Sequence, residues 1–199
     1  MSGSRFTLLP DDRFTVLVPA LEDRLQAIGR SLTAADLSSL LDQVMRQTMD
    51  FAFRQAGAHE GAVWLAEEAT KSLTPVFDSG PHAQQFVGSF KQPLSSGVIS
   101  MVFASEQPFV ENEVFRNSRH DKSLDNLLKV QTYAMIAIPL YFLDACRGVV
   151  SCVQLKVPDS TGPNPPGFTQ RDQAVVRYAS TTLGRLIDHR ILRATFGLR

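Results

Sequence analysis

Residues 133–156 read YAMIAIPLYFLDACRGVVSCVQLK, a stretch in which charged side chains appear only near the middle and at the end. Residues 144–148 carry the turn, so the stretch predicts a β-hairpin. Strands that are apolar at nearly every position are buried on both faces, which places this hairpin in the middle of a sheet with helices on at least one side. Pro139 lacks an N–H donor and predicts a bulge or local break. We expect almost complete burial of Ile136, Ile138, Val149 and Val153.

The composition suits about one globular domain, with 199 residues of which 44% are hydrophobic. The 20 basic and 20 acidic side chains give a formal net charge of zero, whereas a nucleic-acid-binding protein usually carries a basic excess. No apolar run reaches the roughly 18 residues of a membrane-spanning helix, and the opening MSGSRFTLLPDDRF shows no secretory signal. We therefore expect a cytoplasmic protein that binds neither nucleic acid nor membrane.

Apolar residues at spacings of three and four predict three helices. The first spans residues 19–31. The second spans residues 34–55 and begins at the capping box Thr33–Asp36, and the last begins at a second capping box, Thr169–Asp172, and runs to about Arg193. We accordingly expect an N-terminal segment and helix at 1–32, a domain at 33–193 and a C-terminal tail at 194–199.

Short segments rich in β-branched and aromatic residues predict the remaining strands. They are residues 62–66, 73–77, 86–90 and 109–110, with a short helix at 96–104. Pro75 favours a position at a sheet edge for the second of these strands. Residues 111–130, ENEVFRNSRHDKSLDNLLKV, are polar and long for a connection, so we expect this segment to be functional or to contain helical turns.

The order of these elements resembles the GAF domain family over residues 37–192. Five short motifs carry the similarity: PLSSGVI at 93–99, ASEQPFV at 104–110, TYAMIAIPL at 132–140, GVV at 148–150 and FTQRD at 168–172. The resemblance implies an α+β fold with an antiparallel sheet of five or six strands, terminal helices on one face and a ligand pocket on the other. It also implies that residues 111–130, called the lid below, cover that pocket.

Members of this family that bind cyclic nucleotides carry an N-K…F-x-x-x-D-E signature. The matching positions here hold Gln154, Leu155 and Gln173, while Asp172 is retained. Lys156 is one residue out of phase and would point to the opposite face of a strand. A cyclic nucleotide is therefore a candidate ligand with an incomplete signature, and the capping box by itself accounts for Asp172.

Eight residues of the predicted pocket walls and lid form the candidate site, and each has a plainer role open to it. Phe90, Phe103, Phe115 and Tyr133 are candidates for walls that stack a flat ligand, or for ordinary core packing. His120, Asp121 and Asp125 are candidates for polar contacts, with a pH-dependent role for the histidine, or for a solvated loop. Arg116 is a candidate contact for an anionic ligand, or a solvated side chain.

Cys146 and Cys152 are the chain's two cysteines. On one extended strand they would lie about 20 Å apart, too far for a disulfide. A structural zinc site needs four ligands at close spacing, so no metal site is predicted. The free methionine-R-sulfoxide reductases are catalytic GAF proteins that use three cysteines, which this chain lacks. We therefore expect no enzyme activity and no catalytic residues, and the sequence identifies no cofactor.

The resemblance implies a sensory or regulatory module that binds a small molecule and signals to an output partner protein through its terminal helices. We expect a homodimer, with Leu21, Leu25 and Ile28 packed near Leu183, Leu186 and Ile187, partly across its two-fold axis. The alternatives are a dimeric interaction scaffold without a ligand, and a cysteine redox enzyme of the free methionine sulfoxide reductase kind.

Overall fold

The computed structural model describes residues 15–156 and 162–197. Residues 1–31 and 32–199 form two separate compact units. The described part of the first unit contains helix α2 (Val18–Ser31), which confirms the helix predicted at 19–31. The sheet and the cavity described below belong to the second unit.

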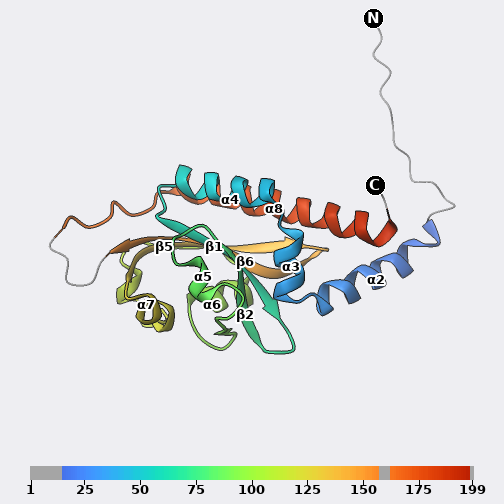
Figure 1. Cartoon of the computed structure of the whole chain (residues 1–199), viewed down its shortest axis with the longest axis horizontal. Coiled ribbons are helices and arrows are strands. Elements are labelled where there is room, and N and C mark those ends of the chain that lie inside the picture. The colour runs from blue at the N-terminus through green and yellow to red at the C-terminus, as the bar shows by residue number, and fades with distance from the viewer. Residues whose placement is uncertain (1–14, 157–161, 198–199) are drawn as a thin grey trace, which may run out of the picture. The chain divides into compact units, whose positions relative to one another are not determined.

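The second unit is built on one six-stranded antiparallel sheet with helices on both faces (Figure 1). Its strands are β1 (Glu60–Glu67), β2 (Ser72–Asp78), β3 (Gln92–Pro93), β4 (Phe109–Glu111), β5 (Gln131–Phe142) and β6 (Ala145–Lys156). They lie in the order β3-β2-β1-β6-β5-β4, so the β5–β6 hairpin is inside the sheet. The predicted α+β class and the internal position of the hairpin are confirmed.

The hairpin turns through two residues, Leu143 and Asp144. Their φ angles of 49° and 54° are both left-handed, as a type I′ turn requires, and the twist of that turn matches the twist of the flanking strands. The turn predicted at residues 144–148 is wrong in position, because Ala145 already pairs with Phe142.

Pro139 is accommodated without the break predicted at that position. It pairs with Val149 in regular register, and the irregularity falls one residue later, between Leu140 and Tyr141. Strand β4 pairs with residues 135–137 of β5 and extends no further. The side of β5 away from β6 is therefore an open edge at Pro139, where a missing N–H is tolerated.

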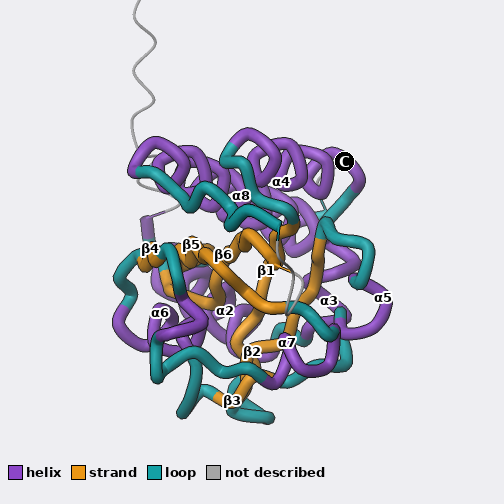
Figure 2. Tube along the Cα trace, turned by 90° about the vertical axis from the view of Figure 1, so that its left-hand side faces the viewer, coloured by secondary structure: helices purple, strands orange, loops and turns teal. Residues whose placement is uncertain are grey.

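Helices α4 and α8 cover one face of the sheet (Figures 1 and 2). Helix α8 (Gln170–Phe196) packs along β5 and against α4 (Gln43–Gln55). The approach is close at Gly184, where a Cβ atom would lie 2.0 Å from the backbone oxygen of Tyr141. Ile136, Ile138 and Val149 are buried as predicted.

The single helix predicted at residues 34–55 is wrong, because the chain forms two helices there. Helix α3 (Ala34–Leu40) ends at Leu41, which is extended, and α4 begins directly after Asp42. The Asp42 side chain accepts a hydrogen bond from the N–H of Met45 at 2.9 Å, and such a cap compensates for the missing helical acceptor. The break lets α3 contact β1 and β2 while α4 runs beside α8. Both predicted capping boxes are confirmed, at Thr33–Asp36 and Thr169–Asp172.

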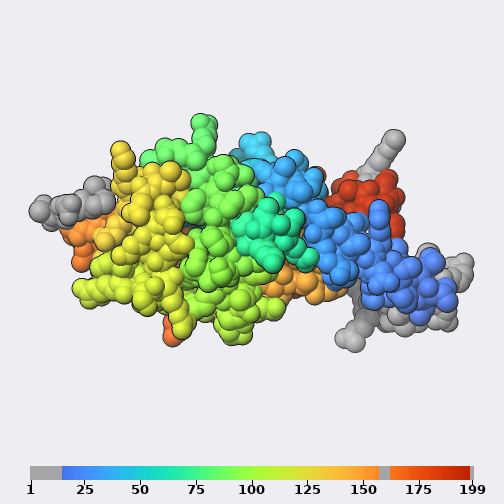
Figure 3. All heavy atoms as spheres, turned by 90° about the horizontal axis from the view of Figure 1, so that it is seen from below, coloured from blue at the N-terminus to red at the C-terminus, as the bar shows by residue number. Residues whose placement is uncertain are grey.

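The opposite face carries the short helices α5 (Ala83–Phe86), α6 (Val98–Ser105), η1 (Val114–Arg116) and α7 (Ser123–Leu128). Figure 3 looks onto this side, where the green-to-yellow segment spreads over the sheet. The helix predicted at 96–104 and helical turns within the lid are confirmed. The strand predicted at 86–90 is wrong: Phe86 ends α5, and Gly88, with a φ of 76°, turns the chain and donates a hydrogen bond to the carbonyl of Pro75.

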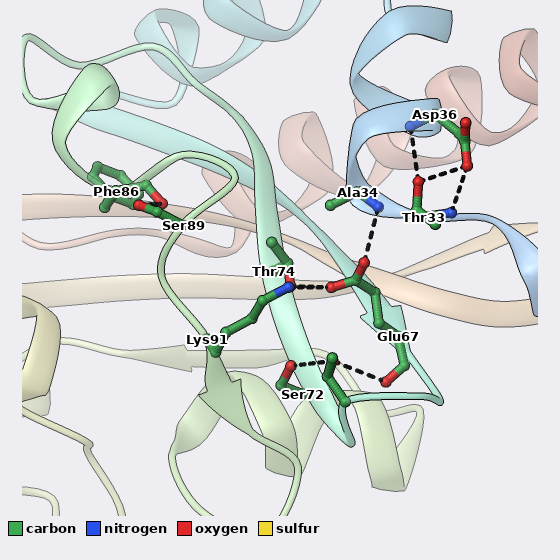
Figure 4. Close-up of polar contacts among 10 residues, drawn as sticks. Thr33, Ala34, Asp36, Glu67, Ser72, Thr74, Phe86, Ser89 and Lys91 are labelled. Carbon is green, nitrogen blue, oxygen red and sulfur yellow. Dashed lines mark hydrogen bonds and ion pairs between the residues drawn. The ribbon is translucent and has the colours of Figure 1, made fainter.

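Glu67 at the end of β1 fixes the neighbouring segments to the sheet (Figure 4). Its carboxylate accepts hydrogen bonds from the N–H of Ala34 at 3.0 Å, from the Thr74 hydroxyl and from Lys91. Burial alone would raise the pKa of Glu67, but these hydrogen bonds outweigh it and hold the pKa below its ordinary value. One charged side chain thus joins the start of α3, strand β2 and the segment before β3.

Candidate ligand-binding cavity

A cavity lies between the sheet and the segments that carry α5, α6 and α7. The centre of a water molecule can reach about 60 Å³ of it. All the empty space between the lining atoms, including the open mouth of the cavity, is about 680 Å³. A water molecule needs roughly 10–15 Å³ on the first measure, so the cavity has room for a few waters in this form. A larger occupant requires the segments above the sheet to move outward.

The register of the sheet brings polar and apolar side chains to the cavity face. Ala62 of β1 lies opposite Asp78 of β2 and opposite Ser151 of β6, and Glu60 lies opposite Val153. Residues directly opposite each other share a face, and all five line the cavity. The prediction of nearly full burial for Val153 is wrong, because its side chain borders this cavity and is only partly buried.

Trp64, Phe86 and Phe90 form an aromatic wall. The indole N–H of Trp64 donates to the hydroxyl of Ser151 at 2.9 Å, and its ring meets that of Phe90 edge-on, with centroids 6.3 Å apart. The polar atom of the buried tryptophan is therefore satisfied within the sheet. Its ring packs within the hydrophobic core and borders the cavity, where it can contact an apolar or cationic group through dispersion and its π-electrons.

Asp125 in α7 anchors one end of the lid to β5. Its carboxylate accepts the Thr132 hydroxyl at 2.6 Å and the Thr132 N–H at 2.9 Å. A ring nitrogen of His120 lies 3.2 Å from the same carboxylate. All three residues line the cavity, so the lid closes over the sheet through a histidine–aspartate–threonine chain.

Asp121, near the middle of the lid, anchors it to β3. Its carboxylate accepts hydrogen bonds from the Ser123 hydroxyl at 2.5 Å and from the side-chain amide of Gln92 at 3.0 Å. These bonds favour the ionised form and lower the pKa of Asp121 to about 2. Asp121 is thus a fixed negative charge beside the cavity across the physiological pH range.

Glu60 and Asp78 are carboxyl groups whose ionisation is opposed by their surroundings. Burial, and then the nearby Asp125, raise the pKa of Glu60. Burial, and then the nearby Glu60, raise the pKa of Asp78 to about 7, although the Gly80 N–H donates to it at 2.7 Å. The sheet side of the cavity therefore exchanges protons near neutral pH.

The family model described as the GAF domain matches residues 34–188. The chain belongs to the GAF domain family.

Several solved structures are similar in fold to this chain. A GAF domain from a phosphoenolpyruvate-protein phosphotransferase of Coxiella burnetii is 12% identical, covers 90% of this chain and 98% of its own, and has a TM-score of 0.61. A domain of a methyl-accepting chemotaxis protein is 18% identical, with coverage of 86% and 97% and a TM-score of 0.57. The free methionine-R-sulfoxide reductase of Neisseria meningitidis, in complex with its substrate, is 15% identical, with coverage of 97% and 98% and a TM-score of 0.52. At these identities the similarity shows the fold alone. No match was found among curated proteins.

Four of the eight predicted site residues line the cavity of this GAF domain: Phe90, His120, Asp121 and Asp125. The other four lie elsewhere. Phe103, in α6, packs against the hydrophobic core. Phe115 and Tyr133 pack against each other with ring centroids 5.6 Å apart and ring planes tilted by 31°. Arg116, whose side chain is 70% exposed, pairs with Glu113 at 2.8 Å. Phe115 and Arg116 miss the cavity because η1, which carries them, does not border it, and α7 is the lid helix that does.

Sequence reasoning missed Glu60, Asp78 and Trp64 as cavity residues. The pattern Glu-Gly-Ala-Val-Trp at 60–64 does hold a signal, since alternation puts Glu60, Ala62 and Trp64 on one strand face. A carboxylate on the same face as a buried tryptophan indicates a polar site in the core. No comparable signal marks Asp78, because strand pairing alone brings it near Glu60.

Both cysteines lie in β6 and are free. Burial raises the pKa of the Cys146 thiol to about 11 and that of the Cys152 thiol to about 12. Within residues 15–156 and 162–197, no group of three or more His, Cys, Asp or Glu side chains could hold a metal ion. No helix in that part of the chain combines the length and apolarity needed to cross a membrane.

Proposed function

We propose that this GAF domain is a sensory or regulatory module that binds a small molecule between the sheet and the lid. The observation that carries the proposal is the cavity itself, which combines an aromatic wall with a few converging polar groups, as small-molecule sites do. The polar groups come from two sources, His120, Asp121 and Asp125 from the lid and Glu60 and Asp78 from the sheet. The chemotaxis protein among the similar folds supports a sensory role.

The lid connects the cavity to the helices of the other face. An occupant larger than a few waters displaces the lid, and the lid is held to β5 through the bonds between Asp125 and Thr132. Strand β5 is the strand on which α8 packs. Movement of the lid is thus passed to β5 and then to α8, which is the route we propose for signalling to an output partner.

The outer surfaces of α4 and α8 supply the contact that we propose for a homodimer. Val44 and Phe51 of α4 are 66% and 63% exposed, and Tyr178 of α8 is 77% exposed. Val44 and Phe51 are seven residues apart and therefore lie on one side of α4. Helices α4 and α8 of two copies would bury these side chains in a four-helix contact. The packing expected between Leu21, Leu25 and Ile28 and the last helix joins two separate units and stays a prediction.

A cysteine redox enzyme is less well supported by the geometry. Attack on a sulfoxide or disulfide requires a thiolate, and the raised pKa values of Cys146 and Cys152 leave little thiolate at neutral pH. The sulfoxide reductase among the similar structures shares the fold with this chain. We therefore propose a regulatory role without catalysis.

Protein purified from its native host provides the test. Native mass spectrometry identifies any co-purifying molecule, and hydrogen exchange is then compared with and without it. We expect slower exchange in the lid and near Tyr133, and a weaker change in α4 and α8. Protection elsewhere with an unchanged lid would show that the site is wrong. If no molecule co-purifies and a broad metabolite screen finds no binder, the chain is a scaffold.

A further inference from the structure

We propose that the molecule bound in this cavity is a small organic ammonium ion, seated on Glu60 beside Asp78 and Asp125 and against the aromatic wall. The inference rests on the proposed function, since it names the chemical class of the ligand for the same cavity. It excludes two other classes of occupant, anions such as cyclic nucleotides and bare metal ions.

Glu60 is a buried carboxylate for which no described residue provides a partner. The residue is 7% exposed, and burial and a like charge act on it without any opposing hydrogen bond. Among the described residues, every side-chain nitrogen or oxygen that is inaccessible to solvent has a hydrogen-bond partner. The oxygens of Glu60 must therefore border open space, and the open space that Glu60 lines is the cavity.

The position of Glu60 is shaped by close packing on its other side. A Cβ atom on Gly80 would lie 2.0 Å from Oε2 of Glu60 and 2.8 Å from its Cβ. Only glycine leaves room there for the glutamate side chain. Packing against Gly80 and burial in the sheet hold the carboxylate at the cavity, where it is the acceptor left for a ligand.

The charges that line the cavity have one sign. Four carboxyl groups border it, those of Glu60, Asp78, Asp121 and Asp125, and within the described parts of the chain no lysine or arginine does. Unlike-charged partners favour ionised carboxylates, and like-charged neighbours disfavour them. A cation in the cavity therefore relieves the mutual repulsion of Glu60, Asp78 and Asp125, whereas an anion adds to it.

The positions that match the cyclic-nucleotide signature confirm how poorly an anion fits. Leu155 lines the cavity at the position of the signature lysine. Lys156 instead donates to the side chain of Asn164 at 2.7 Å. Gln154 donates its amide to the carbonyls of Gly57 and Gly167, at 3.1 and 3.2 Å. These side chains have structural partners, and none of them supplies a positive charge to the cavity.

An organic cation fits better than a metal ion. Metal coordination needs several oxygen or nitrogen ligands converging on one point, and within residues 15–156 and 162–197 no such group of acidic, histidine or cysteine side chains exists. The wall of Trp64, Phe86 and Phe90 instead suits the methyl or methylene groups of an ammonium ion. Ammonium groups are attracted to the faces of such rings, tryptophan most strongly.

Cation binding should strengthen as the pH rises through about 7. Asp78 must lose its proton to face a cation, and its pKa is raised to about 7 by burial and by Glu60, with His82 acting in the opposite direction. Burial, and then the charge of Asp125, likewise raise the pKa of Glu60. A protonated His120 beside Asp125 would repel a cation, so it acts in the same direction as a protonated Asp78. Bound cation should therefore displace protons.

Matched probes of different charge test the proposal. Propylammonium, propanol and propionate have the same length and differ in charge, and choline is paired with its neutral carbon isostere, in which carbon replaces the nitrogen. Ligand-observed NMR titrations at pH 8 measure each affinity in the full chain. We expect propylammonium and choline to bind about tenfold or more tightly than their neutral partners, because a charged contact contributes about 1.5–3 kcal/mol.

The variant Glu60→Gln keeps the shape of the side chain and removes its charge. We expect it to weaken choline binding about tenfold or more and to leave the neutral isostere unaffected. Asp50→Asn is the matched control, because Asp50 loses the same charge on α4, where it pairs with Arg54. Should Glu60→Gln fail to fold, the pH profile of choline binding to the wild type and the protons released, measured by calorimetry in two buffers, carry the test.

The outcomes separate this inference from the proposed function. If propanol or propionate binds as well as propylammonium, or if Glu60→Gln leaves choline binding unchanged, the ligand is not a cation but the cavity still binds small molecules. If Ca²⁺ or Mg²⁺ competes with choline at equal concentration, the cavity is a metal site. If no probe binds, the charge of any co-purified molecule tests the inference. A cationic molecule supports it, and a neutral or anionic molecule overturns it. If nothing binds and nothing co-purifies, both proposals fail.

Discussion

Replacing Asp78 by asparagine should stabilise this GAF domain above neutral pH and have little effect in acid. Burial and Glu60 raise the pKa of Asp78 from its ordinary value of 3.8 to about 7. A raised folded-state pKa contributes stability that is fully present below about pH 4, where both states are protonated, and that is lost as the pH rises to about 7. Asparagine resembles the protonated form at every pH, and its oxygen can still accept the Gly80 N–H.

The size of the effect follows from the same pKa values. A difference between 3.8 and about 7 corresponds to about 4 kcal/mol at 1.36 kcal/mol per pKa unit. This is an upper limit, because Asp78 is partly exposed to the cavity and water screens its charge. We therefore expect Asp78→Asn to raise the free energy of unfolding by about 1–4 kcal/mol at pH 8 relative to its effect at pH 4.

Urea denaturation of both proteins at pH values from 4 to 8 measures the difference. Any pH-independent effect of the amide cancels, because the quantity compared is the change of the difference with pH. Asp121→Asn is the control of opposite sign, because hydrogen bonds from Ser123 and Gln92 lower the pKa of Asp121 to about 2. That variant should lose nearly the same stability at every pH from 8 down to 4, because Asp121 is ionised in both the folded and the unfolded state over that range, and the loss should shrink only below about pH 4. A difference for Asp78→Asn that stays constant with pH would refute the reasoning.

Three further predictions concern packing, redox chemistry and assembly. Gly184→Ala should lower the free energy of unfolding by about 1–3 kcal/mol, because its Cβ would lie 2.0 Å from the Tyr141 backbone oxygen; an unchanged thermal melt would contradict the close approach. Replacing Cys146 by serine should leave ligand binding unchanged, whereas replacing Cys152, which is fully buried and lines the cavity, should cost modest stability; a methionine sulfoxide reductase activity lost in the double variant would show that the chain is an enzyme. Phe51→Glu, or Leu25→Glu together with Leu186→Glu, should give a folded monomer in sedimentation, and a monomeric wild type at high concentration would exclude the dimer.

The sequence alone determined the elements whose causes are local. The apolar run of 133–156 made the hairpin internal, because no surface position suits so many consecutive apolar residues. The two capping boxes located the starts of α3 and α8, since a threonine and an aspartate three residues apart satisfy the first turn by themselves. The order of short motifs was enough for the family. The longest polar run pointed to His120, Asp121 and Asp125, which line the cavity, and ligand binding by these residues stays a prediction.

The tertiary structure decided what depends on pairing between distant segments. The break before Asp42 follows from α3 contacting β1 and β2 while α4 packs against α8, and a continuous apolar stripe gives no sign of it. The strand predicted at 86–90 became a helix end and a turn because Gly88 adopts a left-handed conformation to reach the carbonyl of Pro75. The negative charge of the cavity was the feature least predictable from the sequence. Glu60, Asp78 and Asp125 come from two strands and the lid. Burial raises the pKa of Glu60 and of Asp78, and only register and lid closure add the charge of Asp125 beside Glu60 and the charge of Glu60 beside Asp78.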